Sequence, residues 1–157
     1  MKITLLQIDK TNAGYLNVGI ADYVKRLKNY VVMDIVTINV PKNVKSRSEK
    51  EQKTEESRLL QREIKENDFV VALDEGGKLL DSVEFSGFIQ QKMNNNTKHL
   101  VFVIGGPYGF DEWLYNRADY KLSLSKMTFS HQMVRLFFVE QLYRAYTIFR
   151  GEKYHHK

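Results

Sequence analysis

The sequence contains no cysteine, only two prolines and no uninterrupted apolar run of membrane length. Without cysteine the chain can hold neither a disulfide nor a thiolate metal site. It also lacks a cationic, signal-type start, and a helix that spans a bilayer needs about 20 consecutive apolar residues. These absences predict a soluble, cytoplasmic protein that has no membrane partner.

What the chain does contain is enough apolar residues for a core and an excess of positive charge. Its 157 residues are 43% hydrophobic, which predicts one compact domain over residues 1–157. The formal net charge of +5 favours an anionic partner, because a basic surface attracts phosphate backbones over long distances. Charge alone leaves a nucleic-acid partner and its absence about equally open.

Strand-like and helix-like segments alternate along the chain. Strands are expected at 1–8, 31–40, 69–73 and 100–104, and helices at 15–30, 83–93 and 111–117. Residues 42–66 are highly charged and predict a flexible loop followed by a solvated helix; an RNA-facing arm is the less favoured interpretation. The alternation predicts an α/β fold with a mostly parallel sheet and flanking helices, in which ligands bind beyond the carboxyl ends of the strands.

Two glycine-containing turns, residues 74–78 and 105–109, follow expected strands at those carboxyl ends. Glycine lets a ligand approach the backbone closely, so the two turns could form the walls of one pocket. Neither turn matches the dinucleotide or triphosphate glycine motifs, and simple chain reversal remains the alternative. Asp74 and Glu75 either accept hydrogen bonds from ribose hydroxyls or merely solvate their turn.

The last expected helix, from near Ser130 through 131–149, carries apolar residues on two sides. One small core rarely needs both, so this pattern predicts a second subunit, most simply in a symmetric dimer. Arg144 lies four residues after Glu140 and either pairs with it or contacts RNA. The terminal residues are expected to fray, and the adjacent His155 and His156 make a weak metal site.

Four segments near the C-terminus stand in an order that no generic core requires: 105–109, 124–129, 131–135 and 154–157. In this combination the chain resembles the RlmH enzymes, which are small SPOUT-class methyltransferases. The resemblance extends over essentially the whole chain. It implies a single SPOUT-type α/β domain with a C-terminal trefoil knot, and a homodimer whose active site straddles the subunit interface.

The resemblance also implies a reaction. The cofactor would be S-adenosylmethionine, and the substrate N3 of a pseudouridine in 23S rRNA of the large subunit or the whole ribosome. No appended RNA-binding domain is evident, which favours the assembled ribosome as the substrate. Two alternatives stay open: a non-catalytic RNA-binding module, and a SPOUT methyltransferase that acts on tRNA.

Site residues follow from the resemblance by motif match. The implied cofactor-binding residues are Leu73, Gly105, Leu124, Ser125, Lys126, Met127, Thr128 and Phe129. The residues implied near methyl transfer and RNA are Arg144, Tyr154, His155 and Lys157. Our hypothesis is that His155 is the base or proton relay, while Arg144 and Lys157 hold phosphates or developing negative charge; no metal is expected.

Two departures from the family pattern qualify this assignment. The chain has Ser130 where family members often have proline before the histidine, which is compatible with a helix start because serine is a good N-cap. His156 and Lys157 stand where a single basic residue usually follows the terminal tyrosine and histidine. Either of them could take the role of the terminal cation.

Overall fold

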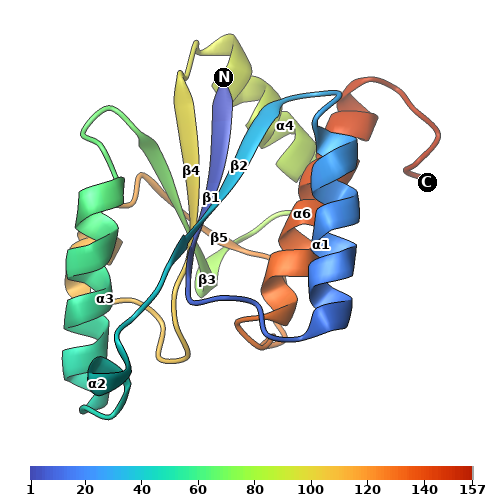
Figure 1. The fold of residues 1–157 in the computed structure, drawn as a ribbon. Helices are drawn as coiled ribbons and strands as arrows, with labels where there is room; N and C mark the ends of the chain where they lie inside the picture. Colours follow the sequence, from blue (N-terminus) through green and yellow to red (C-terminus); the bar gives the residue numbers. More distant parts are fainter. Residues whose placement is uncertain (157) are drawn as a thin grey trace.

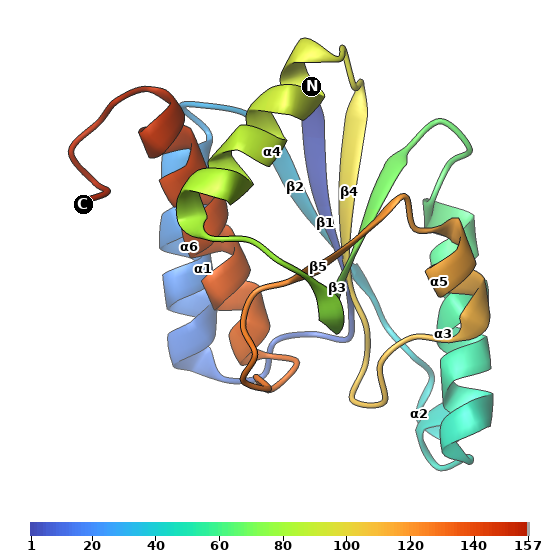
Figure 2. The same ribbon diagram turned by 180° about the vertical axis from the view of Figure 1, so that it is seen from behind.

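The computed structural model describes residues 1–156 and shows a five-stranded sheet between two layers of helices (Figures 1 and 2). The strands are β1 (Lys2–Ile8), β2 (Val32–Ile38), β3 (Phe69–Leu79), β4 (His99–Ile104) and β5 (Tyr120–Ser123). The helices are α1 (Gly14–Leu27), α2 (Lys42–Lys45), α3 (Glu49–Glu63), α4 (Ser82–Asn94), α5 (Glu112–Arg117) and α6 (Met133–Phe149). All strand pairs are parallel, in the order β2-β1-β4-β3-β5, which confirms the predicted α/β class.

The sheet separates two apolar clusters, because side chains alternate between its faces. On central strands β1 and β4, Leu5 and Phe102 enter the cluster beneath α1, α4 and α6. Their neighbours Leu6 and Val103 enter the cluster that includes residues of α2, α3 and α5. Both central strands are therefore buried on two faces, as their continuous apolar sequences require.

The charged stretch 42–66 differs from its prediction. In place of a loop and a solvated helix it forms α2 and then α3, which begins with a capping box between Ser48 and Glu51. One face of α3 is buried although the helix is rich in charge. The buried residues are Gln52, Glu56, Ser57 and Leu60.

The prediction of a separate turn at residues 74–78 is wrong. These residues lie inside β3, at a shift of register where Leu73 and Lys78 both pair with Leu122 of β5. A Cβ placed on Gly77 would lie 2.7 Å from backbone atoms of Leu122, so glycine allows the two backbones to meet. Strand β5 is not among the expected strands, because its four residues are too short for a periodic signal.

Helix α6 begins at Met133, slightly later than expected, and the Ser130 hydroxyl accepts a hydrogen bond from the Met133 amide at 3.1 Å. It packs against both α1 and α4 (Figure 1). Leu142 on one apolar side and Val139 on the other are fully buried within the chain. The two apolar sides of α6 are thus largely buried within the chain and do not by themselves require a second subunit, so the homodimer stays a prediction.

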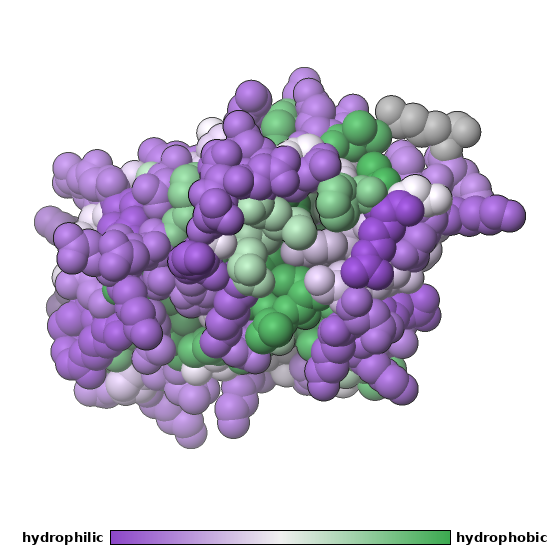
Figure 3. Space-filling view, turned by 90° about the horizontal axis from the view of Figure 1, so that it is seen from above, coloured by the Kyte–Doolittle hydropathy of each residue, from purple (hydrophilic) through white to green (hydrophobic). Residues whose placement is uncertain are grey.

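The two ends of the sheet differ. Figure 3 shows the end at which the strands begin, where hydrophilic side chains surround a small apolar area. The loops that carry the predicted site residues 105–109 and 124–129 lie at the opposite end, after β4 and β5.

No helix within residues 1–156 is long and apolar enough to cross a membrane.

Candidate cofactor pocket and C-terminal tail

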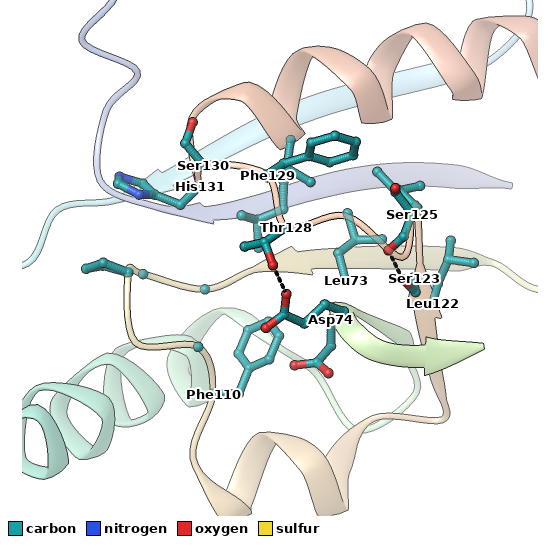
Figure 4. Close-up of a pocket in the computed structure, with 18 of the residues that line it drawn as sticks. Leu73, Asp74, Phe110, Leu122, Ser123, Ser125, Thr128, Phe129, Ser130 and His131 are labelled. Atoms are coloured by element: carbon teal, nitrogen blue, oxygen red, sulfur yellow. Dashed lines mark hydrogen bonds between the residues drawn. The ribbon is translucent and has the colours of Figure 1, made fainter. Parts of the chain in front are cut away.

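A pocket of about 300 Å³ lies at the carboxyl ends of β3, β4 and β5 (Figure 4). This volume is at the lower end of the range for small-molecule sites. Its walls combine apolar side chains, such as Leu73 and Phe110, with the backbone of two loops. Such a lining suits a small molecule that is held by apolar contacts and a few directed hydrogen bonds.

Most of the predicted cofactor residues meet at this pocket. Its lining includes Leu73, Gly105, Leu124, Ser125, Met127, Thr128 and Phe129. Lys126 belongs to the same loop but does not line the pocket. The fold therefore brings together three segments that are far apart in the sequence, and contact with a cofactor stays a prediction for each residue.

Residues 105–109, which we call the glycine loop, form a tight reversal after β4. The Gly109 amide donates to the Gly106 carbonyl at 3.1 Å, and Gly109 has a φ of 76°. A Cβ on Gly105 would lie 3.0 Å from the Phe110 ring and 3.1 Å from the Gly109 carbonyl oxygen. Glycine therefore suits both positions: a side chain at Gly105 would crowd its neighbours, and the positive φ of Gly109 favours glycine.

Hydrogen bonds between polar side chains and the backbone shape residues 124–129. Ser123 donates to the Ser125 carbonyl at 2.8 Å, and the Ser125 hydroxyl accepts from the Met127 amide at 2.9 Å. Thr128 donates to Glu75 at 2.6 Å across the pocket mouth (Figure 4). The segment is therefore an ordered loop that is tied to β3.

Asp74 and Glu75 have different roles in this arrangement. Asp74 accepts from the Gly76 amide at 2.8 Å and from the Tyr115 hydroxyl at 2.7 Å, so both of its oxygens support local structure. Burial and the neighbouring Asp74 raise the pKa of Tyr115 to about 12. Glu75 is exposed and carries the bond from Thr128. Of the two acids, Glu75 is the more accessible to a ligand.

The amino end of α6 is anchored to the end of β1 by a buried arginine. Arg135 has no exposed surface and donates to the Ile8 carbonyl at 2.6 Å and to Thr11 at 2.8 Å. His131, which lines the pocket, has its pKa lowered by burial and by the charge of Arg135. Arg135 therefore fixes one wall of the pocket from behind.

The C-terminal tail packs against α1 and α6, contrary to the expectation that it frays. The Tyr154 hydroxyl donates to Glu140 at 2.9 Å and lies 3.0 Å from the Tyr23 hydroxyl. Burial, together with bonds to Tyr23 and Glu140, raises the pKa of Tyr154. Arg144 pairs with Glu140 at 2.6 Å, which confirms the expected ion pair, and its guanidinium lies 4.7 Å from the centre of the Tyr154 ring.

Glu140, Arg144 and Tyr154 form what we call the tail cluster, and His155 follows it directly in the sequence. Both of its ring nitrogens are shielded from solvent, and neither has a hydrogen-bond partner within residues 1–156. An imidazole in this state can accept or donate a proton once a ligand supplies the partner. The same part of the chain holds no group of three or more His, Asp or Glu side chains suited to a metal ion. The prediction for Lys157 lies outside the described residues.

The pocket and the tail cluster lie toward opposite ends of α6. Ser130 and His131 line the pocket just before α6 begins, whereas the tail follows its last turn. Seventeen residues of α-helix span about 25 Å. The tail turns back beside α1 and α6 but stays away from the carboxyl end of the sheet (Figure 1). Within one chain, the structure does not bring Arg144, Tyr154 and His155 to the predicted cofactor residues.

Some residues at the site cannot be recognised from sequence patterns. Phe110 and Ser123 line the pocket, and nothing in their local sequence distinguishes them from ordinary core and strand-end residues. Glu56 lies behind the glycine loop and is 6% exposed. Its spacing of four from Leu60 could have revealed it, because residues four apart share a helix face.

Comparisons with known proteins agree with this architecture. Residues 1–155 match the family model described as "Predicted SPOUT methyltransferase". Among solved structures, a "probable methylase family protein" from Haemophilus influenzae aligns with 99% of this chain and 70% of its own, with 13% identity and a TM-score of 0.52. At this identity the match supports the fold alone.

Closer relatives extend over the full length. The chain is 53% identical to "Ribosomal RNA large subunit methyltransferase H" of Flavobacterium johnsoniae over 157 residues, which is 100% of both chains. It is 50% identical over the same full length to the protein of that name from Parabacteroides distasonis. The chain therefore belongs to the SPOUT methyltransferases and, within them, to the family of ribosomal RNA large subunit methyltransferase H.

Proposed function

We propose that this protein is an S-adenosylmethionine-dependent methyltransferase that modifies N3 of a pseudouridine in 23S rRNA, with the assembled ribosome as its substrate. The observation that carries this proposal is the pocket at the carboxyl ends of β3, β4 and β5, where the residues assigned by family resemblance converge. The names of the full-length relatives support rRNA as the substrate class. The net charge of +5 suits a polyanionic partner.

The residues of the pocket match the chemical parts of the cofactor. The apolar side chains of Leu73, Leu124 and Phe129 can cover an adenine ring, whose edge needs the backbone donors and acceptors that loops provide. Glu75 at the pocket mouth can accept hydrogen bonds from hydroxyl or ammonium groups. The glycine loop lets a ligand lie directly against the backbone.

The proposed reaction requires the protein to align the cofactor with the target base and to remove one proton from that base. Bound S-adenosylmethionine would supply an electrophilic methyl group on a sulfonium. N3 would lose its proton and take the methyl group, and the electron pair of the broken carbon–sulfur bond would remain on sulfur. His155 would accept that proton, and alignment can contribute roughly 7 to 11 kcal/mol in favourable systems.

Arg144 would stabilise charge at the same step. Its guanidinium has five N–H donors, one of which the structure directs to Glu140, so the Glu140 pair orients the side chain without using all its donors. The remaining donors suit a phosphate or the negative charge that develops on the uracil ring. Lys157 would add a second cation from the end of the tail.

We further propose a homodimer in which the tail of one subunit completes the pocket of the other. The support is the separation along α6, which keeps Arg144 and His155 away from the pocket of their own chain. Helix α1 also exposes Tyr15 and Val18 to 72% and 73%, which leaves apolar surface for an interface. The C-terminal trefoil knot that the family resemblance implies is part of the same proposal. After β5, at the edge of the sheet, the chain returns to α6, which packs against both α1 and α4.

The decisive experiment is transfer of labelled methyl from S-adenosylmethionine to assembled bacterial ribosomes, with mass mapping of the product nucleoside. Ribosomes that lack the pseudouridines serve as the control substrate. The proposal predicts 3-methylpseudouridine in large-subunit rRNA, lost in the control. Cofactor binding without rRNA methylation would favour the tRNA alternative, and absence of cofactor binding would leave the RNA-binding module as the remaining alternative.

A further inference from the structure

A buried carboxylate lies directly behind the glycine loop. Glu56 projects from the inner face of α3 and is 6% exposed. Its buried neighbours on α3 connect that helix to other segments: Gln52 donates to the carbonyls of Lys45 and Arg47, and Ser57 donates to Asp111. Among these buried polar residues Glu56 is the ionisable one.

The carboxylate is in contact with the backbone of Gly106. A Cβ placed on Gly106 would lie 2.6 Å from Oε1 and 2.8 Å from Oε2 of Glu56, so in this arrangement the carboxylate occupies the space that a side chain on Gly106 would need. The Gly106 backbone favours the ionised carboxylate and lowers the pKa of Glu56, against the larger effect of burial. Gly106 also lines the pocket. The loop backbone therefore separates Glu56 from the ligand space, and Glu56 can act on a ligand only through the loop.

The charged groups around Glu56 come from several elements. Asp9, after β1, raises its pKa, and Lys45 of α2 lowers it; these two also pair with each other at 2.7 Å. Asp111, before α5, is bound to the adjacent Ser57. Asp9 also acts on His131 and Arg135, whose pKa values it raises against the larger effect of burial. Burial is the largest effect and raises the pKa of Glu56 to about 7.

This position is unfavourable for the stability of the fold. A carboxyl whose folded pKa exceeds its unfolded value stabilises the protein below the unfolded pKa, and that contribution is lost as pH rises through about 7. An ionised Glu56 is therefore costly at neutral pH and above, whereas an uncharged residue of the same shape would avoid the cost. Core packing alone gives no reason for a carboxylate here.

We propose that Glu56 is a positioning residue for the cofactor: its carboxylate accepts the Gly106 amide and holds the glycine loop in the geometry that binds S-adenosylmethionine. The inference rests on the proposed function of the pocket as a cofactor site. A charged acceptor makes a stronger hydrogen bond than a neutral one. The loop is consequently held more tightly when Glu56 is ionised, and cofactor affinity rises with pH through the range in which it loses its proton.

The first test observes the loop without any cofactor. In the intact protein, the ¹⁵N–¹H resonance of Gly106 should titrate with a midpoint near pH 7. In Glu56→Gln this titration should disappear, because glutamine mimics the protonated carboxyl. Glu63→Gln, which changes an exposed glutamate on the same helix, should leave it unchanged. A Gly106 resonance that is constant from pH 6 to 8.5 in the unmodified protein overturns the proposal without any variant.

The second test measures S-adenosylmethionine binding by calorimetry at pH 6 and pH 8.5. The dissociation constants of Glu56→Gln and the unmodified protein should agree at pH 6 and differ by roughly 3- to 10-fold at pH 8.5. Ionisation of the cofactor's own amino group affects both proteins equally and cancels in their ratio. Any effect of His131 on binding cancels in the same way, because both proteins contain this residue. A ratio that is the same at the two pH values contradicts the role of Glu56.

The two proposals fail in different ways. If the unmodified protein binds no S-adenosylmethionine, the proposed function is wrong, while the Gly106 titration still reports whether Glu56 holds the loop. If the cofactor binds with no pH-dependent difference between the two proteins, the proposed function stands and Glu56 has no positioning role. Urea unfolding at pH 8.5 tests whether the substitution weakens binding merely by destabilising the fold. The free energy of unfolding of Glu56→Gln should be at least as large as that of the unmodified protein.

Discussion

The two ends of α6 carry two halves of one predicted site, and they are built differently. At its amino end, the pocket combines apolar side chains with the backbone of the glycine loop and of residues 124–129. At its carboxyl end, Glu140, Arg144 and Tyr154 form a cluster made of side chains. A backbone site depends on turn geometry and glycine, whereas a side-chain cluster depends on the identity of each residue.

This difference separates binding from chemistry. Changes at the pocket should weaken cofactor binding, and changes at the tail should reduce methyl transfer while cofactor binding is kept. The separation also makes the subunit arrangement testable, because each half can be disabled in a different chain.

The largest effect is expected for His155→Ala. Loss of a general base typically slows a reaction by about 10² to 10⁴ fold, so methyl transfer to ribosomes should fall within that range. The dissociation constant for S-adenosylmethionine should change less than about twofold, because His155 is not among the residues that line the cofactor pocket of its own chain. Single-turnover transfer and calorimetry provide the two measurements. A loss of transfer below twofold would remove His155 from this role.

Mixed dimers distinguish a shared site from a site within one chain. Gly105→Val should disable the pocket, since a Cβ there already lies 3.0 Å from Phe110. When this chain is mixed with His155→Ala chains, half of the dimers are heterodimers. In each heterodimer one of the two sites combines an intact pocket with an intact tail.

The mixture should therefore recover about a quarter of the unmodified activity, while each variant alone stays near background. Differently tagged chains, co-expressed and purified through both tags, isolate the heterodimer for comparison with the two homodimers. If the mixture shows no recovery although heterodimers form, each site is completed within its own chain.

A smaller effect is expected for Tyr154→Phe, which removes the hydroxyl bonded to Glu140 and close to Tyr23. The free energy of unfolding should fall by about 1 kcal/mol, as for a partly exposed hydrogen-bonded group. Urea unfolding measures this change. Tyr108→Phe is a suitable control because Tyr108 is 46% exposed. Equal stability of the two variants would show that the tail is not held by this hydroxyl.

The smallest effect is expected for Thr128→Val, which keeps the shape of the side chain but removes the hydrogen bond to Glu75. An exposed hydrogen bond contributes little, so the S-adenosylmethionine dissociation constant should rise about twofold. Thr54→Val, on the exposed face of α3, is the matched control. A tenfold increase for Thr128→Val would mean that the threonine contacts the ligand itself.

Local patterns predicted much of the architecture. The continuous apolar segments that became β1 and β4 are recognisable because both of their faces are buried. Helix α4 was expected at 83–93 and is found at Ser82–Asn94. The sequence does not reveal strand β5, and it predicts a turn at residues 74–78, because the register shift that joins β3 to β5 depends on a partner strand more than 40 residues away.

The sequence by itself determined the alternation of strands and helices, the family, and the segments that carry the cofactor residues, because periodicity, glycine and motif order are local properties. Only the tertiary structure decided which segments share a pocket, that both apolar sides of α6 are covered within the chain, and that the tail cluster lies away from the pocket. The tertiary structure also decided that Glu56 is buried against Gly106. Each depends on contacts between residues distant in sequence, and such contacts are established only when the whole chain packs.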